Sequence, residues 1–188
     1  MATLEALRDA LPDYARDLKL NLGSVLSSPG APGLTERQVW AVALGAAEAS
    51  RNPAFAAAMG ELSVGHLDDA GQTGARAAAA IMGMNNIYYR FLHLVEDPEY
   101  ARMPARLRMS VIGNPGIEKA EFELICLAVS AINGCGSCVA SHERQVRQHG
   151  FSREAVQSAV RIAATVHAVA RVLENVGWGA ADNTARAA

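Results

Sequence analysis

Alanine, leucine and arginine recur along this chain at the three- and four-residue spacing of helices that have one apolar face. Runs of valine, isoleucine and threonine are short, and aromatic residues make up only 5% of the chain, which is low for a sheet protein. The pattern therefore predicts an all-α fold.

Capping residues and prolines divide the first half into helices. Thr35 and Gln38 match a capping box, in which each side chain bonds the other residue's backbone amide. The helix that they open is expected to end near Pro53, because proline disfavours helix in the residue before it. Pro53 can itself open a short helix. Asp68 is expected to cap a long helix that runs to about Leu94.

The second half begins with a connector at residues 93–116, which is rich in proline and is expected to hold at most a short helical turn. Three helices are predicted after it, at residues 118–132, 135–150 and 152–177. Asn133–Gly134 separates the first two. The residues after Trp178 are expected to fray.

A shift of 84 residues aligns the predicted N-caps Asp68 and Ser152. This suggests two related helical units, 35–95 and 118–177, packed together in one domain that spans residues 1–188. The aligned positions share few identical residues, mostly alanine, so chance similarity is the alternative.

The 188 residues suffice for one domain with a sizeable core, and 51% of them are hydrophobic. The net charge of -2 and the lack of a basic run argue against nucleic acid as a partner.

No stretch approaches the roughly 18 apolar residues needed to cross a membrane. Residues 1–9 carry charged side chains, unlike a signal peptide. We therefore expect a cytoplasmic protein, in a compartment that keeps thiols reduced. The chain has three cysteines, two of them close together, which indicates redox catalysis or metal binding rather than a disulfide framework.

The informative segment contains Cys135, Cys138 and His142, at spacing i, i+3 and i+7 on one helical face. Cysteines three apart in a first helical turn can form a disulfide with little movement. The helix N-terminus and a nearby imidazole both lower a thiol pKa below its usual value of about 8.5. The spacing therefore predicts a reactive thiolate, with His142 as the base.

Glu123 is a single charged residue within the apolar stretch 122–129 of the preceding predicted helix. Burial is expected to raise the pKa of its carboxyl group towards neutrality, which suits proton transfer. The turn at Asn133–Gly134 is expected to fold the two helices together, so that Glu123 approaches and orients His142.

The other candidates have simpler interpretations. Cys126 is expected to be a buried, inert thiol. The remaining histidines are expected at the surface or satisfied in the core: His66, His93, His149 and His167. Core filling is expected of Met82, Met84, Tyr88 and Tyr89.

Glu123, Cys135, Cys138 and His142, in this order and spacing, resemble the signature of the alkyl hydroperoxide reductase AhpD family. Further segments that resemble this family lie at residues 11–22, 81–86, 107–109, 114–116, 122–124 and 128–135. One position departs from some members, which have histidine where this chain has Ser137.

The resemblance implies the all-α fold of the carboxymuconolactone decarboxylase superfamily, a homotrimer, and reduction of alkyl hydroperoxides. It implies that Cys138 forms the sulfenic acid, Cys135 resolves it to the Cys135–Cys138 disulfide, and His142 and Glu123 relay protons. The implied reductant is dihydrolipoamide, carried as lipoyl-lysine on an acyltransferase and recycled by dihydrolipoamide dehydrogenase. The implied protein partner is the peroxiredoxin AhpC, and no tightly bound cofactor or metal is implied.

Two other functions fit parts of the pattern. A superfamily decarboxylase that acts on a lactone acid would not need the cysteine pair. A zinc-stabilised interaction module could use Cys135, Cys138, His142 and Glu123 as ligands, although this spacing on one helix is unlike structural zinc modules. A thioredoxin fold would need strands, and none is predicted.

Overall fold

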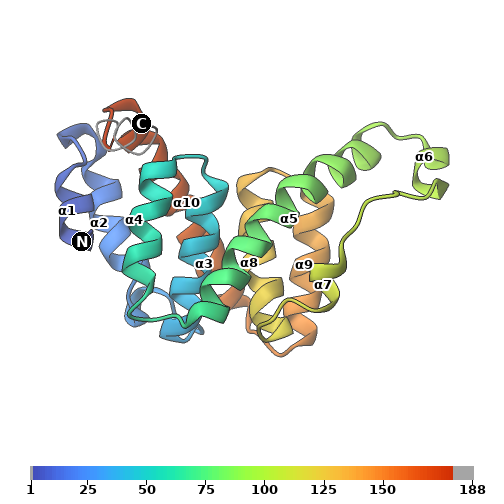
Figure 1. Ribbon diagram of the computed structural model, residues 1–188, viewed down its shortest axis with the longest axis horizontal. Coiled ribbons are helices and arrows are strands. Elements are labelled where there is room, and N and C mark those ends of the chain that lie inside the picture. Colours follow the sequence, from blue (N-terminus) through green and yellow to red (C-terminus); the bar gives the residue numbers. More distant parts are fainter. Residues whose placement is uncertain (1, 180–188) are drawn as a thin grey trace.

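The computed structural model describes residues 2–179, and in this part of the chain it contains ten α-helices, two short 3-10 helices and no strand (Figure 1). The predicted all-α fold is confirmed. The expectation of a frayed C-terminal tail falls mainly on residues 180–188, which lie outside the described residues.

Six helices carry the core and the site: α3 (Glu36–Ala49), α4 (Pro53–Ser63), α5 (Asp69–Leu94), α8 (Lys119–Ile132), α9 (Gly136–Gln148) and α10 (Arg153–Asn175). Helices α3 and α8 lie at the centre and contact each other, and both also contact α5 and α10. Every residue is buried from Val39 to Ala47 in α3 and from Glu121 to Ser130 in α8. Such continuous burial is typical of a helix covered on all sides.

Local chemistry fixes the helix starts that the sequence predicted. In the capping box, Thr35 Oγ1 accepts from the Gln38 amide at 3.2 Å, and Gln38 Oε1 accepts from the Thr35 amide at 3.0 Å. Pro53 opens α4, and Asp68 caps α5 by accepting from the Gly71 amide at 2.9 Å. These predictions are confirmed.

Helix α9 differs from its prediction at both ends. It begins at Gly136, because Cys135 has an extended backbone and serves as the N-cap. It ends at Gln148, and Gly150 adopts a left-handed φ of 90° that leads the chain into the next turn. Cys135 therefore precedes the first helical turn, and the Cys138 amide faces its sulfur at 3.4 Å.

The N-terminal helices α1 (Leu4–Asp9) and α2 (Arg16–Val25) were not predicted from the sequence. Helix α2 packs against α10, and Leu7 and Leu22 are fully buried. The two 3-10 helices are Asp13–Ala15 and Ser28–Gly30. This segment closes one end of the core, away from α9 (Figure 1).

The connector between α5 and α8 forms an arm that projects from the body of the molecule (Figure 1). It holds two short helices, α6 (Pro98–Arg102) and α7 (Ser110–Gly113), one more than expected. Tyr100, Met103 and Leu107 on this arm are exposed apolar residues. No helix within residues 2–179 is long and apolar enough to cross a membrane.

The two proposed repeat units share one helix order. In the first unit, α3 contacts the two helices that follow it, α4 and α5. In the second unit, α8 likewise contacts the two helices that follow it, α9 and α10. Arg37 of α3 pairs with Glu121 of α8 at 3.2 Å, and these residues are separated by the same 84 positions as the predicted caps. The repeat and the single-domain assignment stay predictions.

Candidate active site

The cysteine pair lies at the junction of α8 and α9. Gly134 takes a left-handed φ of 68°, which lets the chain reverse directly before Cys135. Cys135 and Cys138 form a disulfide, with their Cα atoms 5.3 Å apart. Cys135 is completely buried, whereas 7% of Cys138 is exposed. Solvent and substrates therefore reach the pair through Cys138.

Glu123 of α8 lies beside His142 of α9, as expected from the folding-back of the two helices. Its Oε2 lies 2.6 Å from Nδ1 of His142. Its Oε1 pairs with Nζ of Lys119, one helical turn earlier, at 3.1 Å. The two carboxylate oxygens therefore each face one basic group.

The expectation that Glu123 has a raised pKa is wrong. Burial does raise the pKa of this carboxyl group, but hydrogen bonds from His142 and Lys119 outweigh burial and hold the pKa below its usual value. The sequence argument omitted Lys119. Glu123 is therefore an ionised carboxylate beside the His142 ring.

The other face of the His142 ring meets Met82 of α5, whose Sδ lies 3.2 Å from Nε2. The proton of a neutral ring can lie on either nitrogen, so the tautomer decides which of these two contacts the ring donates to. Met82 is buried as expected of core filling, but it also positions the histidine ring from the side opposite Glu123.

A cavity of about 440 Å³ opens onto this cluster. Its lining comes from α5, α7, α8, α9 and the arm: Met82, Asn85, Tyr89, Met109, Ile112, Lys119, Glu123, Ser137, Cys138, Ser141, His142 and Gln145. Cys138 borders the cavity and Cys135 does not. A ligand in the cavity therefore faces Cys138 and His142 together.

Asn85 is a site residue that the sequence argument missed. Its Oδ1 is buried and has no hydrogen-bond partner among the described residues, although the side chain borders the cavity. Buried amide oxygens are nearly always bonded, so this atom is available to a ligand. The signal in the sequence was a pair of asparagines, Asn85 and Asn86, inside a helix.

The remaining candidates lie away from the cluster. Cys126 is a free, buried thiol, and burial raises its pKa well above the ordinary value. His66 stacks on Trp40, His167 faces Ser50, and His93 and His149 are exposed. Core filling is wrong for Tyr89, which is 37% exposed at the cavity.

The four candidate zinc ligands contact one another in pairs in this structure. Both sulfurs are bonded to each other, and Glu123 and His142 are bonded to each other. Within residues 2–179, no three His, Cys, Asp or Glu side chains are arranged to hold a metal ion.

The fold and the site together define a helical protein with a cysteine pair that can cycle between dithiol and disulfide. Comparison of the chain with known proteins identifies the family within this class. A model of the Carboxymuconolactone decarboxylase family matches residues 98–181. The match covers the arm and α8 to α10, and therefore the whole cysteine and histidine cluster.

Several curated relatives are similar over nearly their whole length. An alkyl hydroperoxide reductase AhpD from Rhodospirillum centenum is 55% identical over 172 residues, which are 92% of this chain and 91% of that protein. One from Frankia alni is 48% identical over 186 residues, 99% of each chain. One from Gluconacetobacter diazotrophicus is 55% identical, over 92% of this chain and 93% of its own. The chain belongs to the alkyl hydroperoxide reductase AhpD family.

Proposed function

We propose that this protein reduces alkyl hydroperoxides through Cys138 and Cys135, with dihydrolipoamide as the electron donor. One observation carries the proposal: the disulfide presents Cys138, but not Cys135, to a cavity that also contains His142. Family membership supports the same activity, because the relatives are alkyl hydroperoxide reductases.

In the first step, His142 takes the proton of the Cys138 thiol. The Cys138 thiolate then attacks the terminal oxygen of the hydroperoxide, and the O–O bond breaks. The leaving alkoxide takes a proton from the His142 imidazolium and departs as an alcohol, so that Cys138 becomes a sulfenic acid. The ionised Glu123 stabilises the positive charge on His142 during this step.

In the second step, the Cys135 thiolate attacks the sulfenic sulfur of Cys138. The S–O bond breaks, the hydroxide takes up the proton that the Cys135 thiol gave up and leaves as water, and the disulfide forms. Cys135 serves this role because its sulfur lies at the N-cap of α9, where it faces the Cys138 amide and is shielded from solvent. A backbone N–H at a helix start favours the thiolate form.

In the third step, one thiolate of dihydrolipoamide attacks the sulfur that borders the cavity, Cys138, and Cys135 leaves as a thiolate. The second thiol of dihydrolipoamide then displaces Cys138, which closes the lipoamide disulfide and restores both cysteines. A lipoyl-lysine on an acyltransferase, recycled by dihydrolipoamide dehydrogenase, supplies this dithiol. Such a donor pool fits the cytoplasmic location expected from the sequence.

The same reduced pair can pass its electrons to a disulfide of the peroxiredoxin AhpC by exchange. This second route needs no peroxide in the cavity, so the two routes share the cysteines but differ in their dependence on Asn85. Asn85 is proposed to bind the hydroperoxide, because its unpartnered amide oxygen can accept the peroxide O–H.

We also propose a homotrimer. Apolar residues at the end of α5 and on the arm are exposed in the single chain, among them Phe91, Leu94, Tyr100 and Met103. Phe91 and Tyr100 contact each other edge to face, and exposed apolar surface of this kind favours association with another copy. Light scattering tests the trimer directly, and a stable monomer would contradict it.

The deciding experiment measures peroxide-dependent oxidation of dihydrolipoamide by the purified protein. We expect turnover in the wild type and in Cys126→Ser, and none in Cys138→Ser. Turnover that survives replacement of both Cys135 and Cys138 by serine would reject the proposal. Such a protein would be assayed next as a decarboxylase, which needs no cysteine pair.

A further inference from the structure

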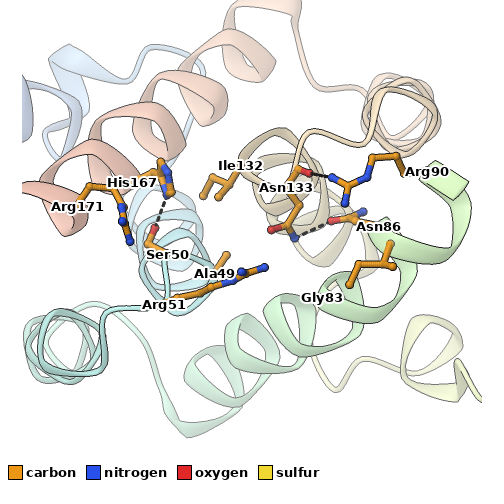
Figure 2. A pocket seen from close by; sticks show the side chains of 11 residues that line it. Ala49, Ser50, Arg51, Gly83, Asn86, Arg90, Ile132, Asn133, His167 and Arg171 are labelled. Carbon is orange, nitrogen blue, oxygen red and sulfur yellow. Dashed lines mark hydrogen bonds between the residues drawn. The ribbon is translucent and has the colours of Figure 1, made fainter. Parts of the chain in front are cut away.

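A second cavity, of about 310 Å³, borders a different face of α5 from the cavity at the cysteine pair (Figure 2). It forms where the C-terminal ends of α3 and α8 meet α5 and α10. Its lining is Ala49, Ser50, Arg51, Gly83, Asn86, Ile87, Arg90, Ile132, Asn133, His167 and Arg171. None of the peroxide-handling residues borders it.

The charge of this lining is one-sided. It contains three arginines and a histidine but no aspartate or glutamate. Arg90 donates to the Asn133 carbonyl at 2.6 Å, and Arg171 pairs with Glu174, which lies outside the lining. Arg51 has no ion pair among the described residues, and its side chain reaches from the end of α3 toward the middle of the cavity in Figure 2.

His167 is held with one nitrogen free. Ser50 donates its only hydroxyl proton to the Ala46 carbonyl at 2.6 Å. The Ser50 oxygen therefore accepts from Nδ1–H of His167 at 3.3 Å, which places the proton of the neutral ring on Nδ1. Nε2 is left for a ligand, and it becomes a donor when the ring is protonated.

A structural role accounts for only part of this lining. Arg90 satisfies a carbonyl at the C-terminal end of α8, which is a common use of arginine. The Arg51 side chain satisfies no carbonyl group among the described residues. Its backbone has a left-handed φ of 60°. A salt bridge within the protein also leaves Arg171 with further N–H groups.

We propose that this cavity binds a small anion through a phosphate or carboxylate group, held by Arg51 and Arg171, while Nε2 of the neutral His167 accepts from a hydroxyl or protonated oxygen of the ligand. Guanidinium groups match the oxygens of either group with paired hydrogen bonds. Asn133 lies on the opposite wall, and its amide oxygen is the group there that can contact the rest of the ligand, because its NH2 group donates to Asn86. The volume suits a small metabolite rather than a lipid or a peptide.

Calorimetric titration in chloride buffer tests the site with three probes: inorganic phosphate, pyrophosphate and citrate. We expect saturable binding by the wild type and a loss of about tenfold or more in affinity for Arg51→Gln. Arg51 is the best residue to change because no ion pair within residues 2–179 is lost with it. The preferred probe separates a phosphate ligand from a carboxylate ligand.

Arg161→Gln is the matched control. Arg161 is an exposed arginine of α10 without an ion pair among the described residues, and it does not border the cavity. It should bind the probes as the wild type does. No saturable binding of any probe, or equal weakening in Arg51→Gln and Arg161→Gln, would overturn the proposal.

Histidine NMR gives a readout that needs no variant. Adding the tightest probe should shift the His167 ring resonances and leave those of the exposed His149 unchanged. Equal shifts at both rings, or none at His167, would also reject the site. Because neither measurement involves the cysteines, failure here leaves the proposed peroxide reduction untouched.

Discussion

The sulfur of Met82 lies 3.2 Å from Nε2 of His142, although 60 positions separate the two residues in the chain. Nδ1 on the opposite edge of the ring meets Glu123 at 2.6 Å. Three helices therefore hold one imidazole: α5 through Met82, α8 through Glu123, and α9 through the backbone of His142 itself. While the disulfide is closed and no thiol is present, Met82 keeps the ring in place.

Replacing Met82 by leucine tests this positioning role. The side chains have similar volume, so the fold should lose less than about 1.5 kcal/mol. The rate of peroxide-driven Cys138 oxidation should fall by roughly threefold to tenfold, because a small displacement of a proton-transferring group is costly. Met59→Leu, at a fully buried methionine that does not line the cavity, is the control.

The measurement is stopped-flow oxidation of the reduced protein across a range of pH. A positioning role changes the pH profile of Met82→Leu relative to Met59→Leu. Two identical profiles with equal rates would show that Met82 only fills space.

The two thiols should behave differently when separated. Cys135→Ser should form a sulfenic acid at Cys138 with peroxide and stall there, since the resolving thiol is absent. Cys138→Ser should form none, because Cys135 is completely buried. A sulfenic-acid probe with mass spectrometry reads both results. Labelling of Cys135 in Cys138→Ser at the wild-type rate would reverse the assignment.

In the wild type, peptide mapping should find Cys135 joined to Cys138 and Cys126 free.

His142→Ala should slow sulfenic acid formation by about 100-fold or more, the usual contribution of a positioned proton acceptor. Glu123→Ala should slow it less, because Glu123 acts through His142. The double variant should cost little more than His142→Ala alone, since residues that act as a unit are not additive. Fully additive effects on the rate would mean that Glu123 acts on another step.

Glu123 should also shape the acid stability of the disulfide form. Its pKa is lowered in the folded protein, so it stabilises the fold above its ordinary pKa, and this contribution disappears as the pH falls through the lowered folded value. Glu123→Gln should therefore be less stable than the wild type at pH 7, by about 1–3 kcal/mol for charge-assisted hydrogen bonds. The difference should shrink towards pH 3. Urea unfolding at several pH values measures it, and a difference that is constant from pH 7 to pH 3 would contradict the ionised state.

Asn85 and Asn86 offer a contrast between adjacent residues. Asn85→Leu should leave stability unchanged or raise it, because its Oδ1 is unpartnered, but should raise the KM for hydroperoxide. Asn86→Leu should destabilise the fold by about 1–3 kcal/mol, because its amide bonds both Ser130 and Asn133 at 2.9 Å. Thermal melts and steady-state kinetics separate the two effects. Unchanged peroxide kinetics in Asn85→Leu would remove Asn85 from the binding site.

The sequence predicted what depends on local spacing. Thr35 and Asp68 cap their helices because capping needs only residues within one turn. The approach of Glu123 to His142 also followed from spacing, since a tight turn leaves two neighbouring helices little freedom.

Contacts between distant parts of the chain could not be predicted from local spacing. Met82 and Asn85 line the cavity because α5 packs against α8 and α9. The spacing of apolar residues within a helix does not predict which other helices it packs against. The pKa of Glu123 was assigned in the wrong direction because burial was weighed without its partners. The spacing of Lys119 and Glu123 by one helical turn was a visible signal that could have corrected it.

Helix α5 forms a wall of both cavities, with Met82, Asn85 and Tyr89 on one side and Gly83, Asn86, Ile87 and Arg90 on the adjacent side. A rigid helix that turns about its own axis carries both sets of side chains together. A rotation that moves Met82 toward His142 therefore also moves Arg90 relative to Asn133. Any displacement of α5 at one cavity would therefore change the shape of the other.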